Sequence, residues 1–385
     1  MSSTPLDPVS LTQEQIRFES VTPHDKGAQA HLKTYLQKMG FTIYDLPFEG
    51  NGGTYPVQNF FARLGSTGPH ICYAGHTDVV PAGDVTGWTY APFGGEIANG
   101  KIYGRGACDM KGGNCAFLAA VSRYLTHSKT PGSISFLITG DEEAESVNGT
   151  VRVLQWMSHH GHIPDVCLVG EPSNPSLFGE SVRVGRRGSL NGHLVVTGKQ
   201  GHVANPHFAD NPVPKLIRLL SALTSHVFDT GNAFFPATNL EITTVDVGNT
   251  AMNIIPAKAE AYFNIRFNDQ WTSDSLKQKI HALLNQAHVP YDVRLWGNAE
   301  SFRTPPGSWV DLVLSVIREK TGQNTQGNTG GGTSDARFIS RYCPVVEFGA
   351  LSKTIHHVDE HIDIDILYQL TDIYHEIIVR YFKMT

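Results

Sequence analysis

Acidic residues and histidines are grouped at several places in the sequence, and their types suit a metal-dependent hydrolase. The group consists of His76, Asp78, Asp109, Glu142, Glu143, Glu171 and His356. Imidazole nitrogens and carboxylate oxygens are ligands that Zn²⁺ accepts. Because the set exceeds what one tetrahedral ion requires, we expect two ions about 3.5–4 Å apart that share a carboxylate.

The spacing within two of these groups predicts separate roles. His76 and Asp78 are two residues apart in an extended segment, so Asp78 can hold the imidazole of His76. Glu142 and Glu143 are adjacent and point to opposite faces, so one can bind a metal ion while the other takes a proton from water. A single acid at a helix start can also be only a cap, and a single histidine is usually an ordinary polar residue. The joint occurrence of these residues favours the metal site.

Short apolar runs precede three of the clusters and predict the strands that position them. Residues 71–74, 133–139 and 166–169 are typical of buried strands, whereas residues 114–125 and 151–158 are typical of helices. This alternation predicts an α/β fold with a mostly parallel sheet. Ligands bind beyond the carboxyl ends of such strands, which is where the polar clusters stand.

A different pattern begins near Gly185. From there the expected order is strand, helix, strand, strand, helix, strand, as in a ferredoxin-like α+β unit. We therefore predict a catalytic domain of residues 1–184 and 297–385 and an inserted domain of residues 185–296. The insert contains few candidate catalytic acids, so we expect it to serve shape or assembly.

Composition and absent motifs exclude several classes of protein. The chain has 30 Lys and Arg against 36 Asp and Glu, a net charge of −6, which argues against a nucleic-acid binder. No apolar run is long enough for a membrane span, and the first residues do not resemble a signal peptide. Five cysteines without paired spacing fit a reducing compartment, so we expect a cytoplasmic protein. A serine hydrolase lacks its Gly-x-Ser-x-Gly motif, and the glycine-rich loop at 330–332 lacks a P-loop ending.

Taken together, the motifs resemble the dinuclear-zinc aminoacylase and metallopeptidase family of amidohydrolases. The matching signatures are residues 75–81, 104–112, 141–143 and 170–172, and the resemblance covers essentially the whole chain. It implies two Zn²⁺ per subunit, for which Co²⁺ can substitute. The implied ligands are His76 and Glu171 for one ion, Glu143 and His356 for the other, and Asp109 as the bridge.

The resemblance also implies three catalytic roles. Asp78 would orient His76, and Glu142 would be the general base and later the general acid. His202, in the insert, would stabilise the carbonyl oxygen during attack and would come from the partner subunit of a homodimer. The insert would be both the dimerisation domain and the lid.

A narrower resemblance concerns the substrate. Residues 185–189, 201–204, 263–267 and 330–335 are similar to family members that hydrolyse N-succinyl-LL-2,6-diaminopimelate to succinate and LL-2,6-diaminopimelate, in lysine biosynthesis. The candidate substrate-binding residues are Arg186, Ser189, Asn253, Arg266, Gly332 and Thr333. The two arginines suit the substrate carboxylates, although either could instead form a salt bridge within the insert.

Two departures from the usual pattern, Met252 and His357, leave fine selectivity open. The alternatives to this reaction are that of another N-acyl amino acid deacylase such as an acetylornithine deacetylase, that of a carboxypeptidase, or the role of an inactive relative that binds small carboxylates or serves as an assembly module.

Overall fold

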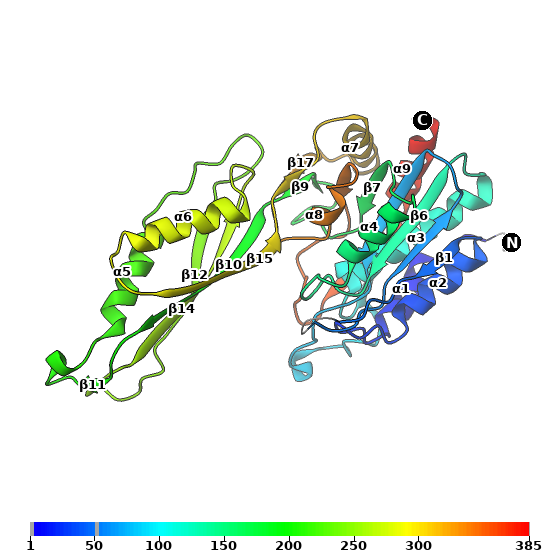
Figure 1. Ribbon diagram of the computed structural model, residues 1–385. Coiled ribbons are helices and arrows are strands. Elements are labelled where there is room, and N and C mark those ends of the chain that lie inside the picture. Colours follow the sequence, from blue (N-terminus) through cyan, green and yellow to red (C-terminus); the bar gives the residue numbers. More distant parts are fainter. Residues whose placement is uncertain (1–3, 51–53, 385) are drawn as a thin grey trace. The chain divides into compact units, whose positions relative to one another are not determined.

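The computed structural model describes residues 4–50 and 54–384, and they form two compact units (Figure 1). The first unit comprises the residues up to Val184, Thr304–Asn328 and the residues from Ser334 onward. The second comprises Gly185–Arg303 and Thr329–Thr333. The second unit thus extends past the predicted limit at residue 296, because β16 (Phe302–Arg303) pairs with β9 (Gly185–Arg186).

An eight-stranded sheet forms the centre of the first unit. Its order is β1 (Thr42–Asp45), β2 (Phe60–Leu64), β6 (Ser133–Thr139), β3 (His70–His76), β7 (Val166–Val169), β18 (Val345–Glu347), β8 (Ser181–Arg183) and β17 (Gln326–Asn328). The strands β6, β3, β7 and β18 run parallel, whereas β1 and β2 are antiparallel at the edge. Strands β3, β6 and β7 are buried throughout, as continuous apolar runs require. The predicted mostly parallel sheet is confirmed.

Helices cover this sheet and complete its core. They are α1 (Pro8–Ile16), α2 (Ala28–Lys38), α3 (Gly112–His127), α4 (Thr150–His159), α7 (Ser308–Thr321), α8 (Ala336–Ile339) and α9 (Ile364–Met384). Helix α3 packs against β3 and α9, and α4 packs against β6. A small sheet of β19 (His361–Asp363), β5 (Lys101–Tyr103) and β4 (Glu96–Ala98) lies beside them. In the described part of the chain, no helix is both long enough and apolar enough to cross a membrane.

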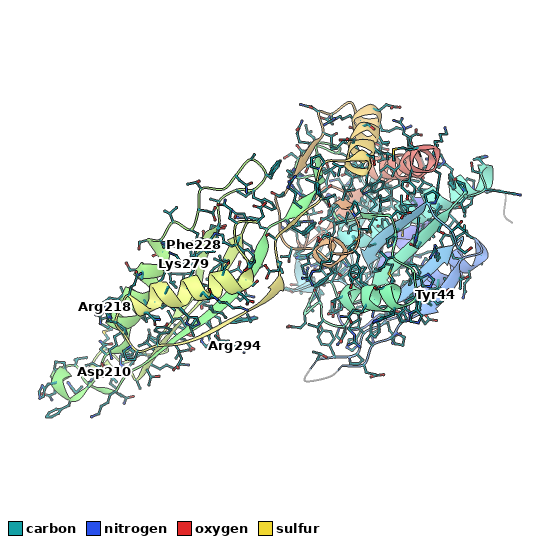
Figure 2. The ribbon with its side chains drawn as sticks, turned by 45° about the horizontal axis from the view of Figure 1, so that its top comes forward. Tyr44, Asp210, Arg218, Phe228, Lys279 and Arg294 are labelled. Carbon is teal, nitrogen blue, oxygen red and sulfur yellow. The ribbon has the colours of Figure 1, made fainter. Side chains whose placement is uncertain are left out.

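The second unit is an antiparallel sheet with two helices on one face. The sheet order is β12 (Asn239–Asp246), β14 (Lys258–Phe267), β10 (Gly188–Thr197) and β15 (Asp292–Ala299). Helices α5 (Pro212–Thr224) and α6 (Ser273–Asn285) pack on β10, and buried and less buried residues alternate along that strand. Arg218 on α5 and Arg294 on β15 are exposed in this unit (Figure 2). The expected ferredoxin-like order is confirmed.

One feature of the second unit was not predicted. A two-stranded ribbon of β11 (Gly201–His202) and β13 (Ile254–Ile255) lies at one end of the four-stranded sheet of this unit (Figure 1). Asp210, whose backbone forms an isolated antiparallel β-bridge with Lys199, lies beside it (Figure 2). The ribbon is very short, so no strand pattern in the sequence could have revealed it.

Candidate metal centre

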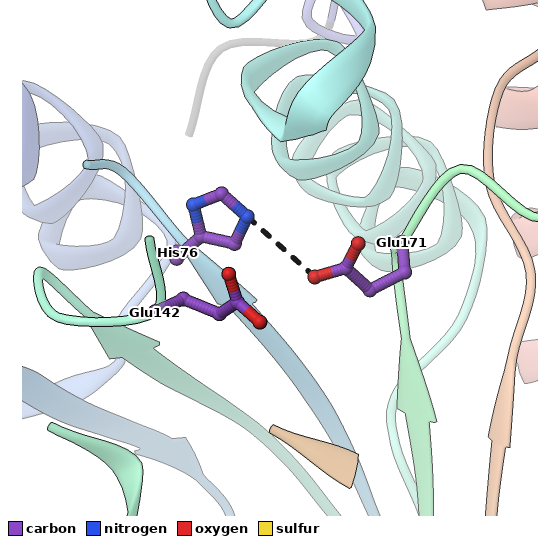
Figure 3. A group of neighbouring side chains, drawn as sticks. All are labelled: His76, Glu142 and Glu171. Carbon is purple, nitrogen blue, oxygen red and sulfur yellow. Dashed lines mark ion pairs between the residues drawn. The ribbon is translucent and has the colours of Figure 1, made fainter. Parts of the chain in front are cut away.

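Three neighbouring strands of the first unit bring the predicted clusters together. Strand β3 ends at His76, Glu142 follows the end of β6, and Glu171 follows the end of β7. These strands are adjacent, with β3 between the other two. The three side chains converge (Figure 3). One potential ligand atom of each lies within 4.8 Å of those of the other two. The expectation that strand ends assemble the site is met for these residues.

Asp109 lies between two histidines that are far apart in the sequence. Its Oδ1 is 3.3 Å from His76 Nε2, and its Oδ2 is 3.6 Å from His356 Nε2. His76 Nε2 is also 3.5 Å from Glu171 Oε1, and His356 Nε2 is 3.1 Å from Glu143 Oε1. The His76 side chain is 1% exposed and that of His356 is 46% exposed, so the first half of the site is the more enclosed.

The ligand atoms of this site are better placed to bind metal ions than to form hydrogen bonds with one another. His76 Nδ1 faces the backbone carbonyl of Asp78 at 2.9 Å, so a proton donated there leaves the lone pair of Nε2 pointing toward Asp109 and Glu171. His76 Nε2 and Asp109 Oδ1 are buried, yet neither makes a hydrogen bond of good geometry within the described residues. Buried polar atoms in that state usually have a bound ion or water as partner.

Asp78 supports the site in a way that differs in detail from the prediction. Its carboxylate Oδ1 is 3.5 Å from His76 Nδ1, and the shorter contact to the ring comes from its backbone carbonyl. Its Oδ2 accepts hydrogen bonds from the amides of Glu142 and Glu143, both at 3.1 Å, and from the Thr22 hydroxyl at 2.8 Å. Asp78 therefore fixes the turn that carries both glutamates, which the spacing of residues could not reveal.

Burial and neighbouring charges shift the pKa values of Glu142, Glu143 and His76. Burial raises the pKa of the Glu142 carboxyl well above its ordinary value, and the negative charge of Glu171 adds to the effect. Burial likewise raises the pKa of Glu143. Burial lowers the pKa of His76, but the Asp109 and Glu171 carboxylates outweigh it and the pKa is raised. Divalent cations would relieve this repulsion among carboxylates.

The predicted residues of the second unit fall into two groups. Arg186 donates to the Gly332 carbonyl at 3.2 Å, and Ser189 is paired with Arg266 across β10 and β14. These residues, with Thr333 in the same loop as Gly332, lie at the β9 end of the sheet.

His202 and Asn253 form the second group, on the ribbon. His202 belongs to β11, and the Asn253 carbonyl accepts a hydrogen bond from the Val203 amide at 3.1 Å. Both side chains are exposed. Strand β10 separates the two groups, and at about 3.3 Å per residue its length is roughly 30 Å. The second unit of one chain therefore does not bring all its predicted site residues together.

Three residues near the centre had no predicted role: Asp335 and Arg105 lie in motifs of the sequence, and Glu360 lies outside them. Asp335 lines a small cavity with His76, Glu142 and Glu171, and burial raises its pKa to about 6. Arg105 forms a buried ion pair with Glu360, 2.7 Å apart. A glycine-rich loop before Asp335 and the Gly-Arg-Gly motif around Arg105 were the only signals for these residues.

Comparison with known proteins identifies the class. Residues 72–380 match the model of Peptidase family M20/M25/M40, and the chain belongs to that family. It is a hydrolase of that family, and the match together with the ligand cluster supports a metal cofactor. The resemblance inferred from the motifs is confirmed.

Individual relatives are similar over nearly their full length. Proteins named succinyl-diaminopimelate desuccinylase are 51% identical in Gluconacetobacter diazotrophicus (97% of this chain, 96% of the relative) and 50% identical in Rhodopseudomonas palustris (100% of both). The protein of the same name from Rhodospirillum centenum is 49% identical (98% and 97%).

Solved structures share the fold at lower identity. An M20 family metallo-carboxypeptidase from Sulfolobus solfataricus has a TM-score of 0.83 at 19% identity, covering 98% of this chain and all of the other. A dinuclear metal binding peptidase of the M20 family from Bacillus subtilis has a TM-score of 0.70 at 15% identity, covering 98% of each chain.

Proposed function

We propose that the chain hydrolyses N-succinyl-LL-2,6-diaminopimelate to succinate and LL-2,6-diaminopimelate. The observation that carries this proposal is 49–51% identity, over nearly the full length, to proteins named for that reaction. The buried cluster of carboxylates and histidines at the strand ends supports it, because hydrolysis of an unactivated amide needs an activated water molecule.

The cluster offers ligands for two metal ions, which we propose to be Zn²⁺, with Co²⁺ as a substitute. His76 and Glu171 would hold one ion, Glu143 and His356 the other, and Asp109 both. The position of Asp109 between the two histidines supports this division. When bound, two such ions lower the pKa of water toward roughly 7 and polarise the amide carbonyl.

Glu142 is the residue that we propose to move the proton. It would take a proton from the water that attacks the amide carbon and deliver it to the amide nitrogen as the C–N bond breaks. The raised pKa of its carboxyl supports both halves of this role, because a group that titrates nearer to neutrality both accepts and donates a proton readily. Asp78 supports Glu142 through the hydrogen bond to its amide.

Positive charge in the second unit suits the carboxylates of the substrate. Arg266 forms no ion pair within the described residues, so the alternative of a salt bridge inside the insert is not seen for it. Burial and then the neighbouring Arg187 lower the pKa of Arg266, and a carboxylate partner would offset both effects. We propose that Arg186, Arg266, Ser189 and the loop of Gly332 and Thr333 bind the substrate.

His202 is proposed to act across a homodimer, and Asn253, next to the same ribbon, is proposed to bind the substrate. The Ala204 amide donates to His202 Nδ1 at 3.0 Å, which leaves Nε2 to carry the proton and to donate it to a developing oxyanion. Exposed apolar side chains occur in the segments next to this histidine: Val203 is 46% exposed, Phe208 68% and Met252 100%. A cluster of exposed apolar groups beside a donor is typical of a surface that a partner covers.

The substrate is tested by a direct comparison of rates. Zinc-loaded protein should turn over N-succinyl-LL-2,6-diaminopimelate with a kcat/KM well above that for N-acetylornithine or a peptide with a free carboxyl terminus. Equal or reversed preference would refute the substrate assignment and leave an M20 hydrolase of other specificity. Loss of turnover on removal of the metal by a chelator, with recovery on adding Zn²⁺, tests the cofactor.

A further inference from the structure

The ion pair between Arg105 and Glu360 is almost completely enclosed in the first unit. Arg105 Nη1 is 2.7 Å from Glu360 Oε2, and the two side chains are 3% and 1% exposed. A buried ion pair is weak evidence for a stabilising role, because the loss of hydration opposes the attraction between the charges. The other hydrogen bonds of the two side chains therefore indicate what the pair does.

Glu360 holds the turn that carries Asp109. Its Oε1 accepts hydrogen bonds from the backbone amides of Cys108, at 3.1 Å, and of Asp109 itself, at 3.3 Å. Its backbone carbonyl also accepts from the amide of Gly104 at 2.8 Å. A carboxylate that accepts from two consecutive amides restricts the backbone on which the proposed bridging ligand stands.

Arg105 holds the segments that carry the two histidines. Its Nη2 donates to the carbonyls of Pro81, at 3.3 Å, and of His356, at 3.4 Å, and its Nη1 donates to the carbonyl of His357 at 3.3 Å. Pro81 belongs to the segment that follows His76 at the end of β3.

The backbone at His356 needs such support. Its φ of 60° lies in the left-handed region, which residues other than glycine adopt at a cost. Hydrogen bonds from a fixed guanidinium to the carbonyls of His356 and His357 hold this conformation. The Trp88 ring, whose centroid is 5.2 Å from the guanidinium carbon, packs against Arg105 and limits its movement.

We propose that Arg105 and Glu360 are positioning residues that set the relative placement of Asp109, His76 and His356. One planar guanidinium reaches two of the ligand-bearing segments, and its carboxylate partner holds the third. A lysine ammonium at position 105 lacks the rigid fork of donors that spans these carbonyls. The proposal rests on the metal centre of the proposed function and is independent of the substrate.

The test measures metal affinity and kinetics of the full-length protein for Arg105→Lys and Glu360→Gln. Competition with a chromogenic zinc chelator should show at least one of the two zinc equivalents bound 10–100-fold more weakly, as is typical when a residue behind metal ligands is changed. In the zinc-saturated variants kcat should fall by about the same range, with KM changed less than about twofold. Arg63→Lys is the matched control, because this arginine of β2 donates to the Ser133 hydroxyl instead; it should match wild type in both readouts.

Two results would overturn the proposal. One is a lowered melting temperature with zinc affinity and kcat near wild type, which indicates a purely structural pair. The other is failure of both variants to fold. The wild type could lack desuccinylase activity while the variants still bind zinc more weakly. That result would support the positioning role and refute only the proposed substrate.

Discussion

The metal centre of the first unit and the ribbon of the second unit each contain a histidine, and the two histidines lie in opposite surroundings. At the centre, His76 is fully buried and meets Asp109 and Glu171 from its own chain. On the ribbon, the His202 side chain is exposed, and its Nδ1 accepts a hydrogen bond from the Ala204 amide. The first region brings its acids and histidines together within one unit, whereas the second presents an exposed histidine. We infer that the buried residues form the part of the site that one chain completes. The exposed histidine belongs to a part that only a partner subunit or a closing motion would complete.

Replacing Asp109 by alanine should break the first region most severely. The carboxylate lies within 3.6 Å of both histidines, so both metal positions should weaken and turnover should fall to background. Metal analysis after dialysis should show less than one zinc per chain. Retention of two zinc equivalents in Asp109→Ala would exclude the bridging assignment.

Glu142→Gln should separate chemistry from metal binding in the same region. The amide keeps the shape of the side chain but cannot accept the proton, so kcat should fall by roughly 10²–10⁴. Zinc content should remain near wild type, because Glu142 is proposed as a base and not as a ligand. Glu143→Gln is the matched comparison and should lose zinc. The reverse pattern of zinc loss would exchange the roles of the two glutamates.

The residues at the strand ends of the metal centre could be predicted from the sequence, because regular strands position them. Continuous apolar runs predict β3, β6 and β7, and the sequence alone predicts that the residues at the ends of these strands lie close together. The pairing of Arg105 with Glu360 could not be found in this way, because the partners are 255 positions apart and the Gly-Arg-Gly motif around Arg105 does not indicate a partner. The contact of His76 with the Asp78 carbonyl was missed for a related reason, since residue spacing describes side chains and not backbone oxygens.

His202→Ala tests the second region. Loss of one oxyanion donor should lower kcat by roughly 10²–10³, with zinc content unchanged. Co-assembled Glu142→Gln and His202→Ala chains should regain activity, because one hybrid site then combines an intact base with an intact histidine. If verified mixed dimers regained no activity, His202 would not act in the site of the partner chain. The distinction drawn between the two regions would then be wrong.

The smallest expected effect concerns the acid stability of the metal-free protein. Burial raises the pKa of Asp335 from an ordinary value of 3.8 to about 6. The folded state therefore holds a proton on this carboxyl, between those two values, that the unfolded state has already released. Its contribution to the free energy of unfolding is present below about pH 4, falls as the pH rises to about 6, and is constant above that. At about 1.4 kcal/mol per pKa unit the loss is at most roughly 3 kcal/mol.

Asp335→Asn removes this titration while keeping the shape of the protonated acid. Metal-free Asp335→Asn should therefore gain stability relative to metal-free wild type as the pH rises from 4 to 7, measured by urea unfolding at each pH. Asp372→Asn is the control, because the Asp372 side chain is 54% exposed and its Arg123 partner lies at the surface, so its curve should follow wild type. Zinc should reduce the difference between wild type and Asp335→Asn, because bound cations compensate the negative charge that makes the ionised carboxyl costly. A stability difference that does not change with pH would mean that Asp335 stays ionised in the folded protein, so that the buried centre already compensates its own charge without metal.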